Sequence, residues 1–212
     1  DEVFIYYVEE DAKAKAKELL EQKYAAAAAR VEEKHLIAFY TSLYTMGVNC
    51  LAVNHGTDTQ IDIQLSELIT RKLPDNLPDG KKIIENPELH LTAIYFMQEI
   101  RRQQSGQLTE ELKELQEELL AHYSRGTYII AVEEDGKVPV LRQKDGSVYQ
   151  PVFTDSLELA KFTKGKKMKN LAVQAAKIPE ILAPNAKGVV VNPLGVNVQL
   201  QIARKKSQET PS

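Results

Sequence analysis

The segment around His55 holds the residue types of a metal site. His55 and Asp58 lie in a turn, and Asp62 follows in the next segment. Imidazole and carboxylate groups are common zinc ligands. Asp62, however, falls on the polar face of an alternating run, so the turn would need an unusual path to bring all three side chains together. We therefore expect a structural turn and a solvated strand face, with no bound metal.

Cys50 is the candidate nucleophile of the sequence. A reactive thiol needs a basic neighbour and access to solvent. Cys50 lies inside a predicted strand, and we expect a buried, inert side chain. Because it is the sole cysteine, it cannot form an intrachain disulfide, and a reducing, cytoplasmic compartment fits best. The other histidines, His35, His90 and His122, lie in predicted helices without metal-ligand spacing to one another.

The remaining catalytic patterns are absent from the sequence. Acidic pairs such as Glu117-Glu118 are adjacent, and adjacent helical residues do not face each other, so they make poor acid-base pairs. The sequence contains no Gly-x-Ser-x-Gly motif and no glycine-rich loop that would cradle phosphate. We expect a noncatalytic protein without a cofactor.

The charge pattern argues against nucleic-acid and membrane partners. The formal net charge is −3, and the one interior basic run, residues 164–169, lacks interleaved aromatic residues. We interpret that run as a solvated loop. No apolar run approaches the roughly 18 residues that span a bilayer, and no signal peptide is visible.

Two hairpins organise the chain. Residues 188–200 combine a β-branched run, an Asn192-Pro193 turn and an alternating strand, which predicts a buried strand followed by a half-buried one. A looser version spans residues 48–65 and also enters its turn through Val-Asn. The sequence therefore predicts an internal repeat, in an α/β fold of two related β-α-β-α-β-β units.

The first copy covers residues 1–72. We expect a strand at 3–8, a helix with Asp11 as its N-cap, and a helix from about Leu36 to Gly47 before the hairpin. The segment Tyr24 to Val31 is ambiguous. Its alanines favour a helix, but the order of the second copy favours a strand, and we predict a strand because propensity is a weak prior.

A linker and a helical pair follow. Residues 73–85 are dense in turn residues and predict a domain boundary. Asn86-Pro87 and Thr109 are typical of helix starts. Each of the two predicted helices has an apolar stripe, which predicts an antiparallel pair, residues 86–124, packed on the second domain.

The second domain is predicted to span residues 86–204, and residues 205–212 to form a disordered tail. We expect strands at 127–132, 138–141, 148–153 and 168–175 ahead of the final hairpin. Short helices are expected from Asp155 to Lys164 and from Pro179. The second copy is thus extended by extra strands and by the helical pair.

These elements resemble the SseB protein N-terminal domain family. The resemblance rests on Val138-Pro-Val-Leu141, on Val152-Phe-Thr-Asp155 leading into Leu157-Glu-Leu159, and on Gly188-Val-Val-Val-Asn-Pro193. It extends over about residues 86–204, and the first copy is a weaker match. The resemblance implies an α/β domain of soluble bacterial proteins. The family is named after an enhanced-serine-sensitivity phenotype, no biochemical activity is established for it, and no catalytic residue transfers to this chain.

The hairpin tips are the predicted binding surface. Asn192, Pro193, Leu194 and Gly195 form one tip, and Asn54 and His55 lie in the other. Leu194 is an apolar residue at a tip, where a core role is hard to arrange; turn chemistry alone also explains the asparagine, proline and glycine. We predict a cytoplasmic protein-interaction or scaffold module with an unknown protein partner, monomeric or weakly homo-oligomeric. The alternative is a small-molecule binding or sensor module.

Overall fold

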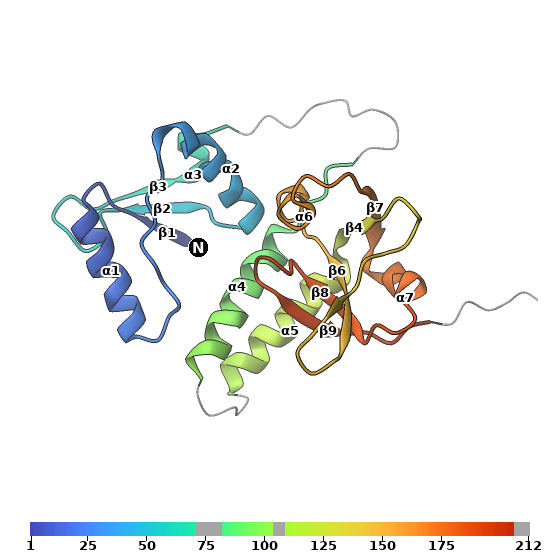
Figure 1. Ribbon diagram of the computed structural model, residues 1–212. Coiled ribbons are helices and arrows are strands. Elements are labelled where there is room, and N and C mark those ends of the chain that lie inside the picture. Colours follow the sequence, from blue (N-terminus) through green and yellow to red (C-terminus); the bar gives the residue numbers. More distant parts are fainter. Residues whose placement is uncertain (71–81, 104–108, 206–212) are drawn as a thin grey trace, which may run out of the picture.

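The computed structural model describes residues 1–70, 82–103 and 109–205 and has a mixed α/β architecture (Figure 1). The N-terminal unit, residues 1–70, lies on one side, and the helices α4 and α5 separate it from the C-terminal strands (Figure 1). The predicted α/β class is confirmed. The expected linker falls largely outside the described residues, as do all but the first residue of the expected tail.

The N-terminal unit is a three-stranded sheet with two main helices. Its sheet has the order β1-β2-β3, with β1 parallel to β2 and β2 antiparallel to β3. The predicted hairpin and the helix ending at Gly47 are confirmed. The elements are β1 (Glu2–Ile5), α1 (Glu9–Glu21), a 3-10 turn (Glu33–His35), α2 (Leu36–Met46), β2 (Cys50–Val53), β3 (Ile61–Gln64) and α3 (Leu65–Leu68).

Helix α1 begins earlier than the sequence predicted. It starts at Glu9, its N-cap is Val8, and no side chain caps it, so the expected cap at Asp11 is wrong. Asp11 lies in the first turn together with Glu9 and Glu10, where carboxylates interact favourably with the positive end of the helix dipole. That dipole interaction accounts for an acidic residue near the helix start without a capping hydrogen bond.

The helical pair consists of α4 (Pro87–Arg102) and α5 (Glu110–Arg125). The two helices are antiparallel, and Thr92 donates a hydrogen bond to Glu118 across them (3.1 Å). Thr109 caps α5 as predicted, its hydroxyl accepting from the Leu112 amide. Asn86 precedes α4 but its side chain caps nothing; it donates instead to the carbonyls of Thr127 in β4 and of Thr154 after β6.

The C-terminal unit, residues 127–205, contains two small sheets. One pairs β4 with β7, and the other has the order β5-β6-β8-β9. A β-bridge between Ile129 and Phe153 connects them. The elements are β4 (Thr127–Val132), β5 (Leu141–Arg142), β6 (Val148–Val152), α6 (Ser156–Thr163), β7 (Lys169–Gln174), a 3-10 turn (Ala175–Lys177), α7 (Ile178–Ile181), β8 (Gly188–Val191) and β9 (Val198–Gln201).

The final hairpin has the predicted faces. Strand β8 is buried along its whole length, as its continuous β-branched run suggested. Strand β9 alternates, with Val198 and Leu200 buried and Gln199 and Gln201 exposed. The period-two pattern therefore set both the strand and its orientation.

Strand pairing follows the same pattern in the two units. Strand β6 is parallel to β8 and β8 is antiparallel to β9, as β1, β2 and β3 are. Each middle strand is followed by an asparagine with positive φ, Asn54 (49°) and Asn192 (46°). The Asn54 amide donates to Ile5 O (2.7 Å), and the Asn192 amide donates to Val152 O (3.0 Å). The same hydrogen bond therefore extends the parallel strand pairing to the asparagine in both units.

The predicted strand from Tyr24 to Val31 is wrong. These residues have no regular secondary structure and are mostly exposed. The physical reason lies in the C-terminal unit, where the corresponding strand, β7, pairs with β4 alone. The described part of the N-terminal unit has no counterpart of β4. A strand at this position would leave its backbone groups without a ladder partner.

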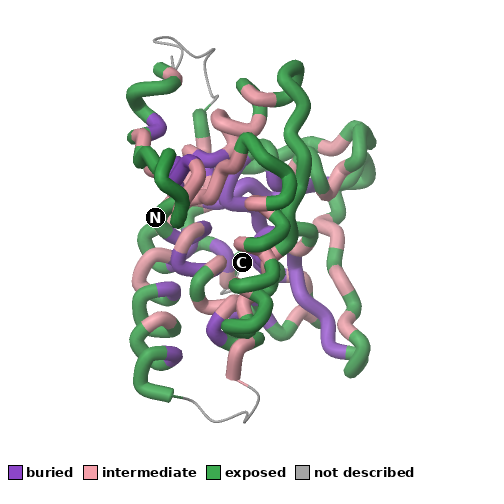
Figure 2. The backbone as a smooth tube through the Cα atoms, turned by 90° about the vertical axis from the view of Figure 1, so that its left-hand side faces the viewer, coloured by how far each residue is buried: buried purple, intermediate pink, exposed green. Residues whose placement is uncertain are grey.

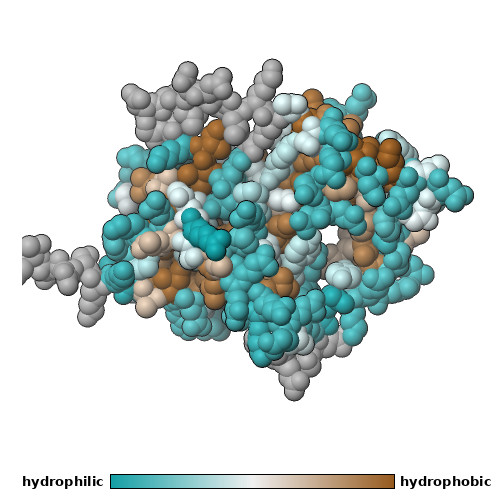
Figure 3. Space-filling model, turned by 180° about the vertical axis from the view of Figure 1, so that it is seen from behind, coloured by the Kyte–Doolittle hydropathy of each residue, from teal (hydrophilic) through white to brown (hydrophobic). Residues whose placement is uncertain are grey.

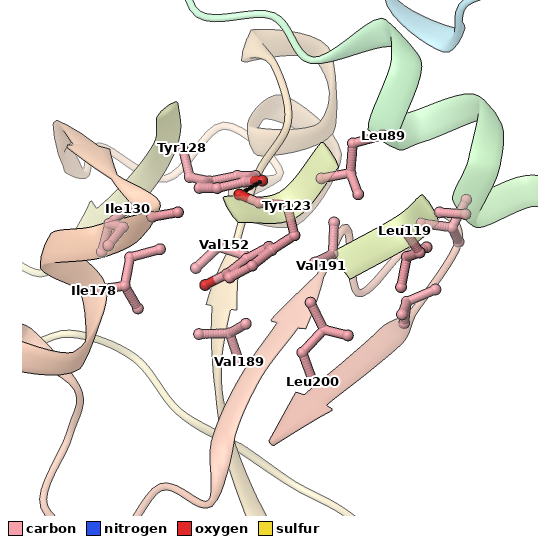
Figure 4. Close-up of a cluster of buried hydrophobic side chains, with 14 of the residues drawn as sticks. Leu89, Leu119, Tyr123, Tyr128, Ile130, Val152, Ile178, Val189, Val191 and Leu200 are labelled. Atoms are coloured by element: carbon pink, nitrogen blue, oxygen red, sulfur yellow. Dashed lines mark hydrogen bonds between the residues drawn. The ribbon is translucent and has the colours of Figure 1, made fainter. Parts of the chain in front are cut away.

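The main core lies between the helical pair and the C-terminal strands. It joins Leu89 and Ala93 of α4, Leu119 and Tyr123 of α5, and buried side chains of β4, β6, β8 and β9. In Figure 4 the Tyr128 ring lies against Tyr123, and its hydroxyl donates to the Tyr123 carbonyl (2.8 Å). Burial raises the pKa of both phenols well above the usual range. The predicted packing of the helical pair on this sheet is confirmed.

The N-terminal unit has a small core of its own and contacts α4 at a few specific points. Its core centres on Leu43, Leu51 and Leu65. Gly47 packs so closely on α4 that a Cβ atom there would lie 2.6 Å from the Pro87 carbonyl oxygen. Tyr95 of α4 donates to the Asp1 carboxylate (2.7 Å). Helix α4 therefore contacts both units.

Buried and exposed residues occupy different parts of the molecule. Buried backbone segments run through the interior, and the outer turns and helix faces are exposed (Figure 2). Seen from behind, the surface is mainly hydrophilic with scattered apolar patches (Figure 3). Within the described ranges, no helix has both the length and the apolar character needed to cross a bilayer.

Candidate functional site

The tip of the final hairpin is held by a buried asparagine. The Asn192 side chain is completely buried; its Oδ1 accepts from the Thr154 amide (3.0 Å) and its Nδ2 donates to Thr154 Oγ1 (2.8 Å). Its carbonyl accepts from Gly195 and Asn197. These bonds fix the direction in which the next residues leave the sheet. Of the predicted tip residues, Asn192 thus positions the tip and presents no surface of its own.

Thr154 and Asp155 extend this buried polar cluster to α4. Asp155 Oδ1 accepts from the amides of Leu157 and Glu158, which caps α6, and Oδ2 accepts from the Thr154 hydroxyl. His90 Nδ1 of α4 lies 3.7 Å from Asp155 Oδ2, beyond hydrogen-bonding distance. Burial raises the pKa of Asp155, but interactions with His90, the Glu158 amide and Thr154 outweigh it and hold the pKa below its usual value.

Gly195 lies close to the Glu158 side chain of α6. A Cβ atom at this position would lie 2.6 Å from Glu158 Oε2. Glu158 is itself buried, and Lys161 pairs with its other oxygen, Oε1. The tip therefore packs closely on the first turn of α6, and its backbone has little freedom to move.

Leu194 extends outward from this fixed turn, with 54% of its surface exposed. It borders a groove of about 700 Å³ that we call the tip groove. The groove is assembled from the hairpin tip, the end of α6 with the loop after it, strand β5 and the β4–β5 connection. Its lining residues are Glu133, Glu134, Pro139, Leu141, Arg142, Gln143, Phe162, Thr163, Lys164, Lys166, Lys167, Met168, Pro193, Leu194 and Asn197.

The groove combines an apolar wall with a basic edge. Phe162 and Met168 pack against the cluster around Phe153, so their exposed parts form a firm apolar surface. The basic loop, residues 164–168, places Lys164, Lys166 and Lys167 beside it. These lysines are exposed and form no ion pair with any residue of the described ranges.

The loop geometry keeps the lysines at the groove. Lys164 ends α6 in the left-handed region (φ 48°), and Gly165 follows with φ 82°. The Lys166 amide then donates to the Thr163 carbonyl (2.9 Å), which closes the turn. We predicted this run to be a solvated loop; it is solvated, and it also forms one edge of the groove. Four cationic side chains, Arg142 included, and two carboxylates, Glu133 and Glu134, line it.

The first tip has the same frame and a different surface. Asn54 Oδ1 accepts from the Tyr7 amide (3.3 Å), as Asn192 accepts from Thr154. The His55 carbonyl accepts from the Tyr6 hydroxyl, and the His55 ring packs on Phe4 with centroids 4.9 Å apart. Asn54 and His55 are half-buried and lie in the N-terminal unit, so they do not line the tip groove.

The other candidate residues do not form a second site. The described part of the chain contains no group of three or more histidine, cysteine or acidic residues placed to hold a metal ion. Cys50 is half-buried, not buried as expected, because it is the first residue of β2. Sequence reasoning missed the buried His90–Asp155 pair and the apolar wall of the groove. The sequence did contain a signal for the apolar wall, because the apolar residues Phe162 and Met168 lie on either side of the basic run.

Comparison with known families and proteins gives one match. Residues 107–205 match the model of the family described as SseB protein N-terminal domain. The match covers α5 and the whole C-terminal unit, and it begins after α4, which the sequence resemblance had included. No match was found among curated proteins or among solved structures. The tip groove lies entirely within the matched residues.

Proposed function

On the premise that residues 107–205 are an SseB protein N-terminal domain, we propose that this chain is a noncatalytic protein-interaction module. Its tip groove binds an extended partner segment that carries an apolar side chain next to carboxylates. The observation that carries the proposal is Leu194, held half-exposed by a buried turn beside three unpaired lysines. The compartment proposed is the cytoplasm, where a free Cys50 stays reduced.

Packing and exposure support an interaction surface. An exposed leucine on a rigid turn presents apolar area without an ordering cost on binding. Recognition residues are often placed in this way, on loops that a packed sheet holds fixed. The tip is rigid because Asn192 and Gly195 are both constrained by buried contacts. Leu194 is therefore suited to act as the apolar anchor for a partner side chain.

Charge supports an acidic partner. The chain as a whole has a net charge of −3, whereas the groove has two more cationic than anionic side chains. Unpaired lysines at a rim speed the encounter with an oppositely charged partner and select against a basic one. Because the lysines are exposed, binding should weaken as salt concentration rises, on the scale of a Debye length of about 8 Å at physiological ionic strength.

A small-molecule ligand is the second candidate. The groove volume, about 700 Å³, lies within the range of ligand pockets, and polar groups converge on an apolar wall. An organic anion would meet the same lysines and the same leucine. The two candidates differ in how much of the groove they contact. In this proposal an extended segment contacts Arg142, Leu194 and the loop lysines together, whereas a small molecule contacts the lysines and the leucine.

The segment from β1 to β3 and the segment from β6 to β9 are proposed to be copies of one ancestral unit. The shared strand pairing and the shared asparagine turns support this. In this proposal the N-terminal copy has lost the strand that corresponds to β7. Its tip, with Asn54 and His55, then presents a second surface on the same frame.

The function is tested with a labelled peptide that contains leucine flanked by glutamates. We expect binding to the full chain, about tenfold weaker binding to Leu194→Asp, and weaker binding to the Lys166→Glu/Lys167→Glu variant. A matched control is Lys17→Glu, an exposed lysine on α1 away from the groove. Equal affinity for all four proteins, or preference for a lysine-flanked peptide, would refute the proposal.

A further inference from the structure

The outer edge of β6 in the C-terminal unit is paired at both ends. In a parallel pair, alternate residues direct their backbone groups to the neighbouring strand, and the residues between them direct theirs outward. Tyr149 pairs with Leu141 of β5, and Phe153 exchanges two backbone hydrogen bonds with Ile129 of β4. Between them lies Pro151, which has no amide proton to donate. Each outward donor of this edge is therefore either paired or absent.

The corresponding edge of β1 is open. The Asp1 and Ile5 carbonyls accept from the β2 side, so Glu2, Phe4 and Tyr6 direct their backbone groups away from it. In the shared pairing these three correspond to Tyr149, Pro151 and Phe153. Strand β1 pairs with β2 alone, and no backbone hydrogen bond from the outward residues reaches any part of the chain the structure describes.

Helix α1 places smaller or polar residues at the positions where α6 has large apolar ones. Leu159 and Phe162 of α6 pack against the cluster that contains Ile129 and Phe153. Helix α1 buries no residue, and Ala12 and Lys15 stand at the matching positions. The Lys15 side chain is only 14% exposed, and its Nζ lies 5.1 Å from the centre of the Phe4 ring. An added strand beside β1 would therefore place its apolar side chains against Ala12 and the aliphatic part of Lys15.

We infer that the β1 edge binds an extended segment of another protein as an antiparallel added strand. The strands that pair with the outer edge of β6 indicate which side chains the bound segment carries. Leu141 and Ile129 lie opposite positions four residues apart, so the bound segment carries apolar residues four positions apart, opposite Glu2 and Tyr6. Backbone pairing supplies the affinity and the two apolar side chains supply the selectivity.

This inference rests on the proposed repeat and concerns a surface separate from the tip groove. The two proposals therefore fail separately. Leu194→Asp should leave strand binding at β1 unchanged. A change at the β1 edge should likewise leave the glutamate-leucine peptide bound at the tip groove.

The test uses the full chain and a nine-residue peptide with isoleucine and leucine four positions apart. We expect the Glu2, Phe4 and Tyr6 amides to exchange rapidly in the free protein and to become protected when the peptide is added. The same peptide, N-methylated at the amides that would face β1, should not protect them. Phe4→Pro, which copies Pro151 and removes one edge donor, should weaken binding about fivefold, the effect of one hydrogen bond.

The melting temperature separates lost binding from lost folding. Phe4→Pro is expected to melt cooperatively, because Pro151 occupies the matching position in the C-terminal unit. If instead the variant unfolds, the N-methylated peptide still decides the question with the unaltered chain. The inference is wrong if the three amides are already protected without peptide. It is equally wrong if both peptides bind with the same affinity.

Discussion

Replacing Asn192 with alanine should lower the free energy of unfolding of the C-terminal unit by about 3 kcal/mol. The side chain is fully buried, and both of its hydrogen bonds go to Thr154. Alanine would remove both bonds and leave the Thr154 amide and hydroxyl without these partners. This is the best-defined energetic consequence of the tip geometry.

The magnitude follows from two effects. A buried hydrogen bond contributes about 1 kcal/mol, and a buried donor left unpaired costs about 1–3 kcal/mol. The backbone at Asn192 also has φ 46°, where alanine is less favourable than asparagine by about 1 kcal/mol. Asn192→Gly relieves only the second effect, so it should be less damaging than alanine by that amount.

Asn54→Ala is the matched control. Asn54 has the same left-handed backbone and the same bond to the amide two residues after the strand end, but it is only half-buried and the bond is longer (3.3 Å). Its loss should cost about 1–2 kcal/mol, of which about 1 kcal/mol comes from alanine in the left-handed backbone. Urea denaturation, followed by circular dichroism and tyrosine fluorescence, measures both variants. Equal losses at the two positions, or a loss below about 1 kcal/mol at Asn192, would refute the reasoning.

Three further predictions concern packing and pH. Gly47→Ala should lower the melting temperature and loosen α2 from α4, because its Cβ would meet the Pro87 carbonyl and φ is 81°; hydrogen exchange in α2 reports the loosening. Gly195→Ala should cost about 1–2 kcal/mol by displacing Glu158, as urea titration will show. The lowered pKa of Asp155 means that its carboxylate stabilises the fold above about pH 4 and that this stability is lost as pH falls through the lowered pKa. Asp155→Asn should flatten that part of the acid-unfolding curve, and an unchanged curve would contradict the assignment.

Local patterns predicted most of the elements. Both hairpins, the helix ending at Gly47 and the Thr109 cap followed from alternation and from end signals that depend on neighbouring residues only. Tyr24 to Val31 failed because a strand also needs a partner, and β7 has its partner in β4, more than thirty residues before it in the chain. No property of the alanine run itself reveals whether such a partner exists.

The site was predicted only in part for a similar reason. Leu194 was recognised because an apolar residue at a turn has no core position available. The tip groove, however, brings together β5, the end of α6 and the hairpin, and no single stretch of sequence shows that they meet. The His90–Asp155 pair likewise joins a helix to a distant cap across 65 residues of sequence. Contacts of this kind depend on tertiary packing.

The most direct test of the interaction proposal is a titration of the isotope-labelled chain with the glutamate-leucine peptide, followed by NMR amide shifts. We predict saturable shifts confined to the basic loop, residues 164–168, and to the tip around Leu194, with smaller shifts at Arg142. The same peptide with lysines in place of glutamates should produce none. Shifts spread over both units, or concentrated at Asn54 and His55, would contradict the account and place the binding surface elsewhere.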